Sequence, residues 1–220
     1  MTDDIRARLS KVDACAVSDA LDALGLDGAT TGLHSVSVAK QIVGRAVTVD
    51  LADYDGTPSS RHLGTAAVDA SGPGDVIVVA GHGRRTVAGW GGVLSAGASV
   101  RHVVGIVVDG AARDVDQATE YGLAVYAAAA VTRSARGRVV ERAWNVPVSV
   151  AGVTVCPGDW VIADGSGVVF VPAGHIGEVL AKAEAVVARE TLLAARALTG
   201  EPLAEVMGRD YESMLNGGGR

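Results

Sequence analysis

The chain has 220 residues, of which 49% are hydrophobic and 20% are charged, and its formal net charge is −6. This length and composition suffice for one domain with a sizeable core, so no disulfide framework is needed. The negative charge gives no electrostatic basis for binding nucleic acid, and Cys15 and Cys156 are too few and too far apart for a disulfide framework or a CxxC metal site.

Nothing in the sequence indicates a membrane or secretory destination. Residues 1–4 lack the basic start of a signal peptide, and the longest apolar stretch, 123–131, is far shorter than a membrane span. We therefore expect a cytoplasmic protein, which the low cysteine content also favours. Aromatic residues make up only 4% of the chain, so aliphatic side chains must fill the core, as suits an α/β protein.

Short elements are predicted in the first third of the chain. Residues 2–25 have the pattern of two short helices, and alternating apolar residues between 36 and 51 indicate half-buried strands. The polar segment 53–61 is predicted to be a loop that either borders a site or crosses the surface. A helix over 62–70 and a strand over 76–80 are expected to follow.

Glycines surround His82 after that strand. Neither the GxGxxG pattern nor the GxxxxGK[ST] pattern is completed in this region, which argues against a phosphate-binding loop. His82 is isolated in the sequence, and a structural role is the ordinary interpretation of such a histidine. It is also a candidate acid–base group if it lies near the next glycine turn.

The segment 89–117 is the most informative part of the chain. Its glycines at 89–92 can adopt positive φ and allow a ligand to approach the backbone closely. Residues 93–101 are predicted to form a helix with one packed face. The apolar run 103–108 is typical of a strand buried on both faces, which implies a parallel or mixed sheet.

An arginine–aspartate pair follows this strand in a predicted turn over 109–114. Open α/β sheets hold ligands at the carboxyl ends of their strands. Arg113 could grip a substrate carboxylate through two hydrogen bonds, while Asp114 could ligate a hard cation such as Mg²⁺. Alternatively, Asp114 caps a helix over 115–121 and Arg113 forms a surface ion pair. Spacing alone leaves both interpretations open.

The remaining elements complete an α/β pattern. A buried strand is predicted over 123–131, a strand pair over 148–155, a hairpin over 160–171 and a long helix over 173–198. The four arginines between 133 and 142 indicate a loop or edge hairpin, which either meets an acidic partner or is a solvated face.

Several motifs together resemble one protein family. Gly91-Gly92-Val93-Leu94 and the run from Gly105 to Asp114 are similar to the family that joins class II 4-hydroxy-4-methyl-2-oxoglutarate (HMG) aldolases to regulator of ribonuclease activity A (RraA) proteins. The supporting motifs are Val17–Leu21, Gly74–Val79, Pro157–Asp159 and Ala163–Pro172. The likeness spans roughly residues 10 to 190.

The resemblance implies a fold and an assembly. We expect an α/β fold, in the form of a single compact RraA-like α/β/β domain with a mixed sheet flanked by helices. This domain is predicted to cover residues 1–200, followed by a C-terminal extension over 201–220 with a flexible end. A homotrimer or hexamer is expected, with the site near a subunit boundary.

The resemblance also implies a site. In the family's aldolases, a pyruvoyl group is held by the residues that match Gly91, Gly92, Val93, Leu94 and Arg113. The residue that matches Asp114 binds Mg²⁺ or Mn²⁺, so Arg113 and Asp114 are the catalytic candidates. The metal and the arginine would stabilise a pyruvate enolate, which implies a lyase that acts on a small 2-oxo acid as an HMG/CHA aldolase or an oxaloacetate decarboxylase.

Gly92 departs from the family's pattern. Active aldolases carry an acidic residue at the matching position, where it is thought to assist proton transfer, an effect ordinarily of about 10²–10⁴-fold. Three functions therefore stay open. The protein is a metal-dependent lyase, a non-catalytic RraA-like regulator that binds a ribonuclease complex, or an enzyme that uses the same scaffold for another enol or enolate reaction.

Overall fold

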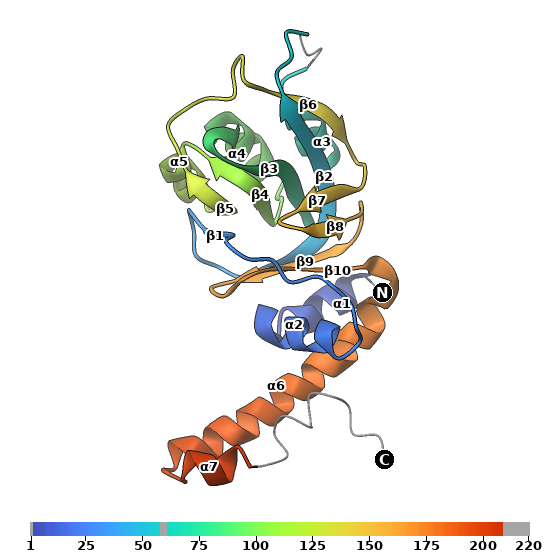
Figure 1. Ribbon diagram of the computed structural model, residues 1–220, viewed down its shortest axis with the longest axis vertical. Helices are drawn as coiled ribbons and strands as arrows, with labels where there is room; N and C mark the ends of the chain where they lie inside the picture. The colour runs from blue at the N-terminus through green and yellow to red at the C-terminus, as the bar shows by residue number, and fades with distance from the viewer. Residues whose placement is uncertain (1, 58–60, 209–220) are drawn as a thin grey trace.

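A computed structural model describes residues 2–57 and 61–208 of the chain and shows a mixed α/β fold (Figure 1). Its large sheet contains eight strands. Seven follow one another in the order β1 (His34–Ser35), β5 (Ala124–Ala130), β4 (Gly105–Ala112), β3 (Asp75–Trp90), β2 (Ile42–Asp53), β9 (Trp160–Asp164) and β10 (Gly167–Val171). The eighth strand, β6 (Val139–Trp144), pairs with the far end of β2.

Strand directions confirm the predicted mixed sheet. The pairs β2–β3, β3–β4 and β4–β5 are parallel, whereas β1, β6, β9 and β10 pair antiparallel with their neighbours. A bridge between Ala29 and Val169 brings the segment before β1 against β10. The sheet is therefore nearly closed on itself.

Two layers cover the faces of this sheet. One face packs against α3 (Thr65–Ala70), α4 (Gly92–Val100) and α5 (Val115–Glu120), with Ile77, Ile106 and Val108 among the buried strand residues. The other face packs against the hairpin of β7 (Val148–Val150) and β8 (Val153–Val155). The β-branched runs of β3 and β4 are buried on both faces, as their composition predicts.

A third core lies beneath β9 and β10. There α1 (Thr2–Leu9), α2 (Ala14–Asp22) and α6 (Ile176–Leu198) pack through Leu9, Leu21 and Leu180. These elements confirm the two N-terminal helices, the hairpin and the long helix. The short turns η1 (Ala173–His175) and α7 (Leu203–Val206) flank α6. Among the described residues, no helix combines the length and apolar character that crossing a membrane requires.

Two strands are longer than the sequence predicts. β3 continues past Ala80 to Trp90, so the glycines beside His82 lie within a strand, and β4 continues to Ala112, so the turn predicted to begin at Asp109 is wrong. The two strands stay paired beyond Ala80 through irregular register. Glycine at 110, with φ of 150°, allows this bulged pairing without a side-chain clash.

The C-terminal predictions are tested only in part. The extension predicted over 201–220 contains α7, and the domain boundary at 200 stays a prediction. The flexible end expected at 217–220 lies outside the described residues.

Candidate functional site

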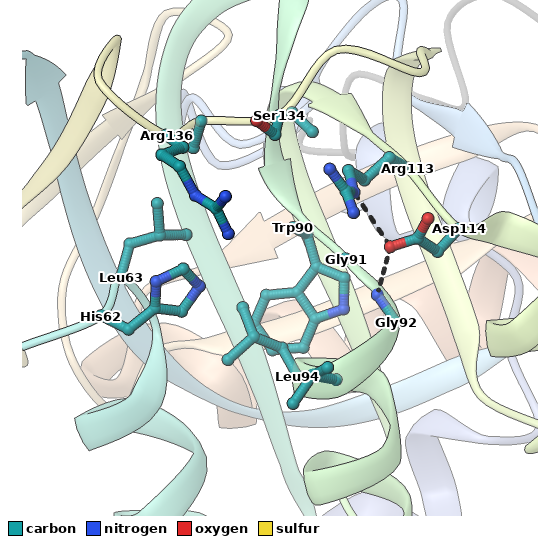
Figure 2. Close-up of a pocket in the computed structure, with 13 residues that line it drawn as sticks. His62, Leu63, Trp90, Gly91, Gly92, Leu94, Arg113, Asp114, Ser134 and Arg136 are labelled. Carbon is teal, nitrogen blue, oxygen red and sulfur yellow. Dashed lines mark hydrogen bonds and ion pairs between the residues drawn. The ribbon is translucent and has the colours of Figure 1, made fainter.

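A pocket of about 230 Å³ opens where β3 ends, α4 begins and β4 passes into α5 (Figure 2). Cavities for drug-sized ligands usually measure roughly 300–1,000 Å³, so this pocket suits a smaller molecule. All six residues that the family resemblance implicates line it, namely Gly91, Gly92, Val93, Leu94, Arg113 and Asp114. Other residues in its wall are His62, Leu63, Ala88, Trp90, Ser134, Ala135 and Arg136.

Backbone and side-chain hydrogen bonds hold the glycine turn in place. The indole Nε1 of Trp90 donates to the hydroxyl of Ser95 at 2.9 Å, and this hydroxyl donates to the carbonyl of Gly91 at 3.1 Å. The backbone N–H of Arg113 donates to the carbonyl of Trp90 at 3.0 Å. The ends of β3 and β4 are thus joined directly at the pocket.

A Cβ at either glycine of this turn would meet neighbouring side chains, and neither glycine has a positive φ. Gly91 is extended, with φ of −159°, and a Cβ there would lie 3.2 Å from Asp114 Oδ2. Gly92 begins α4, and a Cβ there would collide with the Gln117 Oε1 atom and lie 3.1 Å from Asp114 Cβ. The positive φ expected at these glycines is therefore wrong, whereas the close approach of a ligand to this backbone stays a prediction.

Gln117 fills the space that a side chain at position 92 would occupy. Its side chain is exposed and extends from α5 onto the first residue of α4. The absence of an acid at position 92 therefore does not leave a hole in the structure. The amide of Gln117 covers this position from the neighbouring helix.

Asp114 directs its carboxylate across the turn instead of capping its own helix. Oδ2 accepts hydrogen bonds from the backbone N–H of Gly92 and from Nε of Arg113, each at 3.0 Å. Asp114 occupies the N-cap position of α5, but its side chain makes no capping hydrogen bond. The interpretation of this side chain as a helix cap is therefore wrong.

The backbone of Asp114 is in the left-handed region, with φ of 55° and ψ of 40°. Such a conformation costs on the order of 1 kcal/mol for a non-glycine residue, although aspartate tolerates it better than most. It aims the carboxylate at the beginning of α4. The Gly92 N–H, followed by the Arg113 guanidinium, lowers the pKa of Asp114 against the opposing effect of partial burial.

Arg113 keeps most of its hydrogen-bonding capacity. Its side chain is 37% exposed, and the bond to Asp114 uses only Nε. A guanidinium carries five N–H donors, so both terminal nitrogens remain for an anion in the pocket. The fold thus orients the arginine–aspartate pair, and the unbonded terminal nitrogens of Arg113 are available at the cavity.

The opposite side of the pocket comes from loops, and the sequence did not identify its residues. His62 was expected to begin a helix, but α3 starts at Thr65 because Gly64 before it has a left-handed φ of 79°. Arg136 lies in the basic segment whose partner was left open. Loop residues far apart in sequence carry no periodicity that would predict their meeting, so only the folded chain reveals it.

His82 is not part of this pocket. Its Nε2 atom lies 2.8 Å from Asp50 Oδ1, and the residue lines a separate cavity together with Asp53, Arg84 and Glu141. The continuation of β3 past Ala80 carries His82 away from the glycine turn. Its interpretation as a replacement acid–base group at this turn is therefore wrong.

One carboxylate is available for a metal ion in the pocket. Residues 2–57 and 61–208 contain no cluster of three or more histidine, cysteine or acidic side chains suited to hold a metal. Mg²⁺ usually binds through only one or two carboxylates and keeps several water ligands. Asp114, whose Oδ1 atom is not used in the bonds to Gly92 and Arg113, fits this mode of binding.

Comparisons with known proteins agree on one family. The family model RraA-like, described as Aldolase/RraA, matches residues 14–170. A Halalkalibacterium halodurans protein named "Putative 4-hydroxy-4-methyl-2-oxoglutarate aldolase" is 32% identical over 82% of this chain and 82% of its own length. Protein DlpA of Legionella pneumophila is 28% identical over 93% of this chain, which spans only 33% of the length of DlpA.

Solved structures share the fold. A crystal structure of an uncharacterized Pseudomonas syringae protein matches with a TM-score of 0.84 and 30% identity, over 94% of this chain and 98% of that chain. Streptomyces coelicolor RraAS2, described as "an unusual member of the RNase ES inhibitor RraA protein family", matches with a TM-score of 0.76 and 25% identity, over 86% of this chain and 94% of that chain.

Proposed function

Because the chain belongs to the RraA-like family, we propose that it is a divalent-metal-dependent lyase that breaks a carbon–carbon bond in a small 2-oxo acid. The aldolase name of the Halalkalibacterium halodurans relative supports this reaction class. The observation that carries the proposal is the Asp114 carboxylate held between the Gly92 N–H and the Arg113 guanidinium in a small pocket. The substrates we expect are of the HMG, CHA or oxaloacetate type.

Arg113 and the beginning of α4 would hold the acid. The terminal nitrogens of Arg113 match the two oxygens of a carboxylate, which allows a pair of parallel hydrogen bonds. The first N–H groups of a helix have no acceptor within the helix, so those of Val93 and Leu94 offer donors to an anion at this end. Both sets of donors adjoin the same cavity.

Asp114 would hold the metal ion. Its carboxyl is ionised at neutral pH, since the pKa lies below the ordinary value near 3.8, and a ligand of Mg²⁺ or Mn²⁺ must be ionised. A divalent cation bound there would supply Lewis-acid polarisation of the substrate's oxo group. Asp114 also fixes the orientation of Arg113 through Nε, so the metal ligand and the carboxylate-binding residue are positioned together.

Cleavage sends an electron pair from the breaking bond towards the oxo group and leaves the enolate of pyruvate. The fixed guanidinium of Arg113 and the N–H groups of α4 would stabilise this negative charge without reorganising. Aldol cleavage also requires the loss of a hydroxyl proton, whereas decarboxylation releases CO₂ without that step. Since Gly92 supplies no acid–base side chain, we expect oxaloacetate decarboxylation to be the faster of the two activities.

The direct test is pyruvate release, measured with a coupled dehydrogenase, from oxaloacetate and from HMG. Turnover should require added Mg²⁺ or Mn²⁺, stop with a chelator and return when metal is restored. Because oxaloacetate also decarboxylates slowly with free Mg²⁺, the rate without protein is subtracted. Turnover that persists in the chelator, or none with either substrate and either metal, would remove the lyase proposal.

A regulator that does not catalyse is the second candidate. It is favoured by Gly92 and by the similarity to RraAS2, which is described as a member of a ribonuclease-inhibitor family. Capture of ribonuclease components by the purified chain, together with inhibition of their activity and no pyruvate release, would support it. Pyruvate release without such capture would exclude it.

A third candidate is another enol or enolate reaction in the same pocket, which Gly92 also allows. Thermal shifts of the protein with a panel of small carboxylates, recorded with and without Mg²⁺, would distinguish such an enzyme from an interaction protein. Metal-dependent stabilisation by an acid that is neither cleaved nor decarboxylated would favour this candidate. The absence of any carboxylate-dependent shift would oppose it.

We further infer a homotrimer or hexamer. Val93 and Val100 on α4 are 89% and 79% exposed, so apolar surface lies beside the pocket. Contact with another copy of the chain would cover it. Light scattering after size-exclusion chromatography should give the mass of three or six chains, and a monomer at micromolar concentration would contradict this inference.

A further inference from the structure

The wall of the pocket that faces Arg113 carries a second guanidinium. Figure 2 shows Arg136 and His62 on one side of the buried Trp90 ring and Arg113 with Asp114 on the other. Arg136 points its guanidinium over the cavity. Within residues 2–57 and 61–208, this guanidinium makes no hydrogen bond or ion pair, whereas that of Arg113 is bonded to Asp114.

A defined turn presents Arg136 to the pocket. Nη1 of Arg138 donates to the backbone carbonyl of Arg136 at 3.1 Å, and the backbone N–H groups of Arg138 and Val139 donate to the carbonyl of Ala135 at 2.8 and 2.9 Å. Arg138 therefore folds back on the loop while Arg136 projects away from it. These hydrogen bonds define the backbone turn from which the Arg136 side chain projects.

The charges around the cavity are unbalanced. Arg113 and Arg136 contribute two positive charges, and Asp114 contributes the one carboxylate among the lining residues. That carboxylate already lies 3.0 Å from Arg113. An excess of positive charge in a concave site attracts anions. This excess is a local property of the pocket, since the formal net charge of the whole chain is −6.

We propose that Arg136, with His62 beside it, forms a second anion subsite that selects 2-oxo acids with a carboxylate at the end remote from the oxo group. This inference rests on the proposed function, since it assumes that Arg113 holds the carboxylate next to the oxo group. Arg136 is thereby a specificity-determining residue, and its guanidinium binds the distal carboxylate.

Two ligands of equal chain length test the subsite. 2-Oxoglutarate ends in a carboxylate where 2-oxopentanoate ends in a methyl group, so the ratio of their dissociation constants isolates the distal charge. Titration calorimetry in Mg²⁺ should show tighter binding of 2-oxoglutarate. In Arg136→Leu this preference should fall about 2- to 5-fold, the range expected for an exposed charge pair. Arg136→Lys should restore part of it.

Arg133→Leu is the matched control, because Arg133 lies in the same basic segment, loses the same charge and does not line the cavity. Its preference should equal that of the wild type. A wild-type protein without preference for 2-oxoglutarate, or an Arg136→Leu variant that keeps the full preference, would overturn the subsite. If Arg133→Leu loses the preference for 2-oxoglutarate to the same extent, the effect comes from overall charge. That result would also overturn the subsite.

Failure of the subsite can be told apart from failure of the proposed reaction. If pyruvate is released but the ratio of the two dissociation constants does not depend on Arg136, the lyase proposal stands and the subsite is removed. An Arg136-dependent preference without pyruvate release from any 2-oxo acid would keep the subsite and remove the lyase.

Discussion

The two sides of the pocket differ in how the fold holds them. The side built from Gly91, Gly92, Arg113 and Asp114 joins the ends of two central strands to two helices, and hydrogen bonds of about 3 Å connect its members. The side with His62 and Arg136 comes from segments outside those elements, and both of its side chains are exposed.

This difference indicates a division of roles. A group that stabilises charge in a reaction must be held in place before the reaction begins, which requires a rigid scaffold. A group that selects among substrates tolerates more freedom, and loops on a rigid scaffold are where such variation is usually found. If the proposals above hold, bond cleavage belongs to the side with Gly91, Gly92, Arg113 and Asp114, here called the bonded side. Substrate choice then belongs to the side with His62 and Arg136, here called the exposed side.

Replacement of Arg113 should cause the largest loss of activity. A small loss would contradict the division of roles between the two sides of the pocket. Arg113→Ala removes the carboxylate grip and the positive charge near the enolate, so kcat/KM for pyruvate release should fall by about 10²–10³-fold or more. Arg113→Lys should remain strongly impaired, because an ammonium cannot form the paired hydrogen bonds. Arg133→Ala serves as the control. A loss below about 10-fold in Arg113→Ala would place the reaction elsewhere.

Replacement of Asp114 should affect the metal first. Asparagine tolerates the left-handed backbone and can still accept the Gly92 hydrogen bond, so Asp114→Asn keeps the turn and removes only the charge. The Mg²⁺ concentration for half-maximal activity should rise by at least about 10-fold. Asp116→Asn, which changes an exposed acid two residues away, should leave it unaltered. The same Mg²⁺ dependence in both variants would show that Asp114 is not the ligand.

The same contrast explains what the sequence could predict. The buried runs of β3 and β4 and the helical periodicity of α6 are local patterns, so the mixed sheet and the long helix were predictable. The bonded side of the pocket lies within one continuous segment and carries family motifs. The lengths of β3 and β4 were missed because their continuous apolar runs stop at Ala80 and Val108, whereas the strands continue beyond them through irregular pairing.

The exposed side of the pocket was beyond the reach of pattern analysis. His62 and Arg136 are separated in sequence and come together only through the packing of β2, β6 and the segments beside them. The same holds for Gln117, whose contact with Gly92 joins two helices. Family motifs identified Gly92 as a departure, but only the structure shows which side chain lies against it.

An acidic side chain at position 92 would test the division of roles further, because it would add a proton-transfer group beside Arg113 and Asp114. Gly92→Asp alone should collide with the Gln117 amide, so the informative protein is Gly92→Asp combined with Gln117→Ala. Its aldol cleavage should rise about 10- to 10²-fold, which is part of the gain usual for general acid–base catalysis. Gln117→Ala alone should show no gain. Unchanged cleavage in a well-folded double variant would mean that another residue already transfers the proton.

The smallest expected effect is the contribution of the Asp114 interactions to stability. The Gly92 N–H, followed by Arg113, holds the pKa of this carboxyl below its ordinary value near 3.8. Such a group stabilises the folded state above that value, and the contribution is lost as pH falls through the lower folded-state pKa. Because the side chain is 32% exposed, the contribution should stay below about 1 kcal/mol.

Urea unfolding of the wild type and of Asp114→Asn would measure this contribution. The difference in their free energies of unfolding should be larger at pH 6 than at pH 3.5, because protonation removes the charge that the substitution removes. A difference that grows towards pH 3.5 would mean that the folded state favours the protonated carboxyl. The hydrogen bonds from the Gly92 N–H and Arg113 would then not stabilise the ionised form of Asp114 in the folded state.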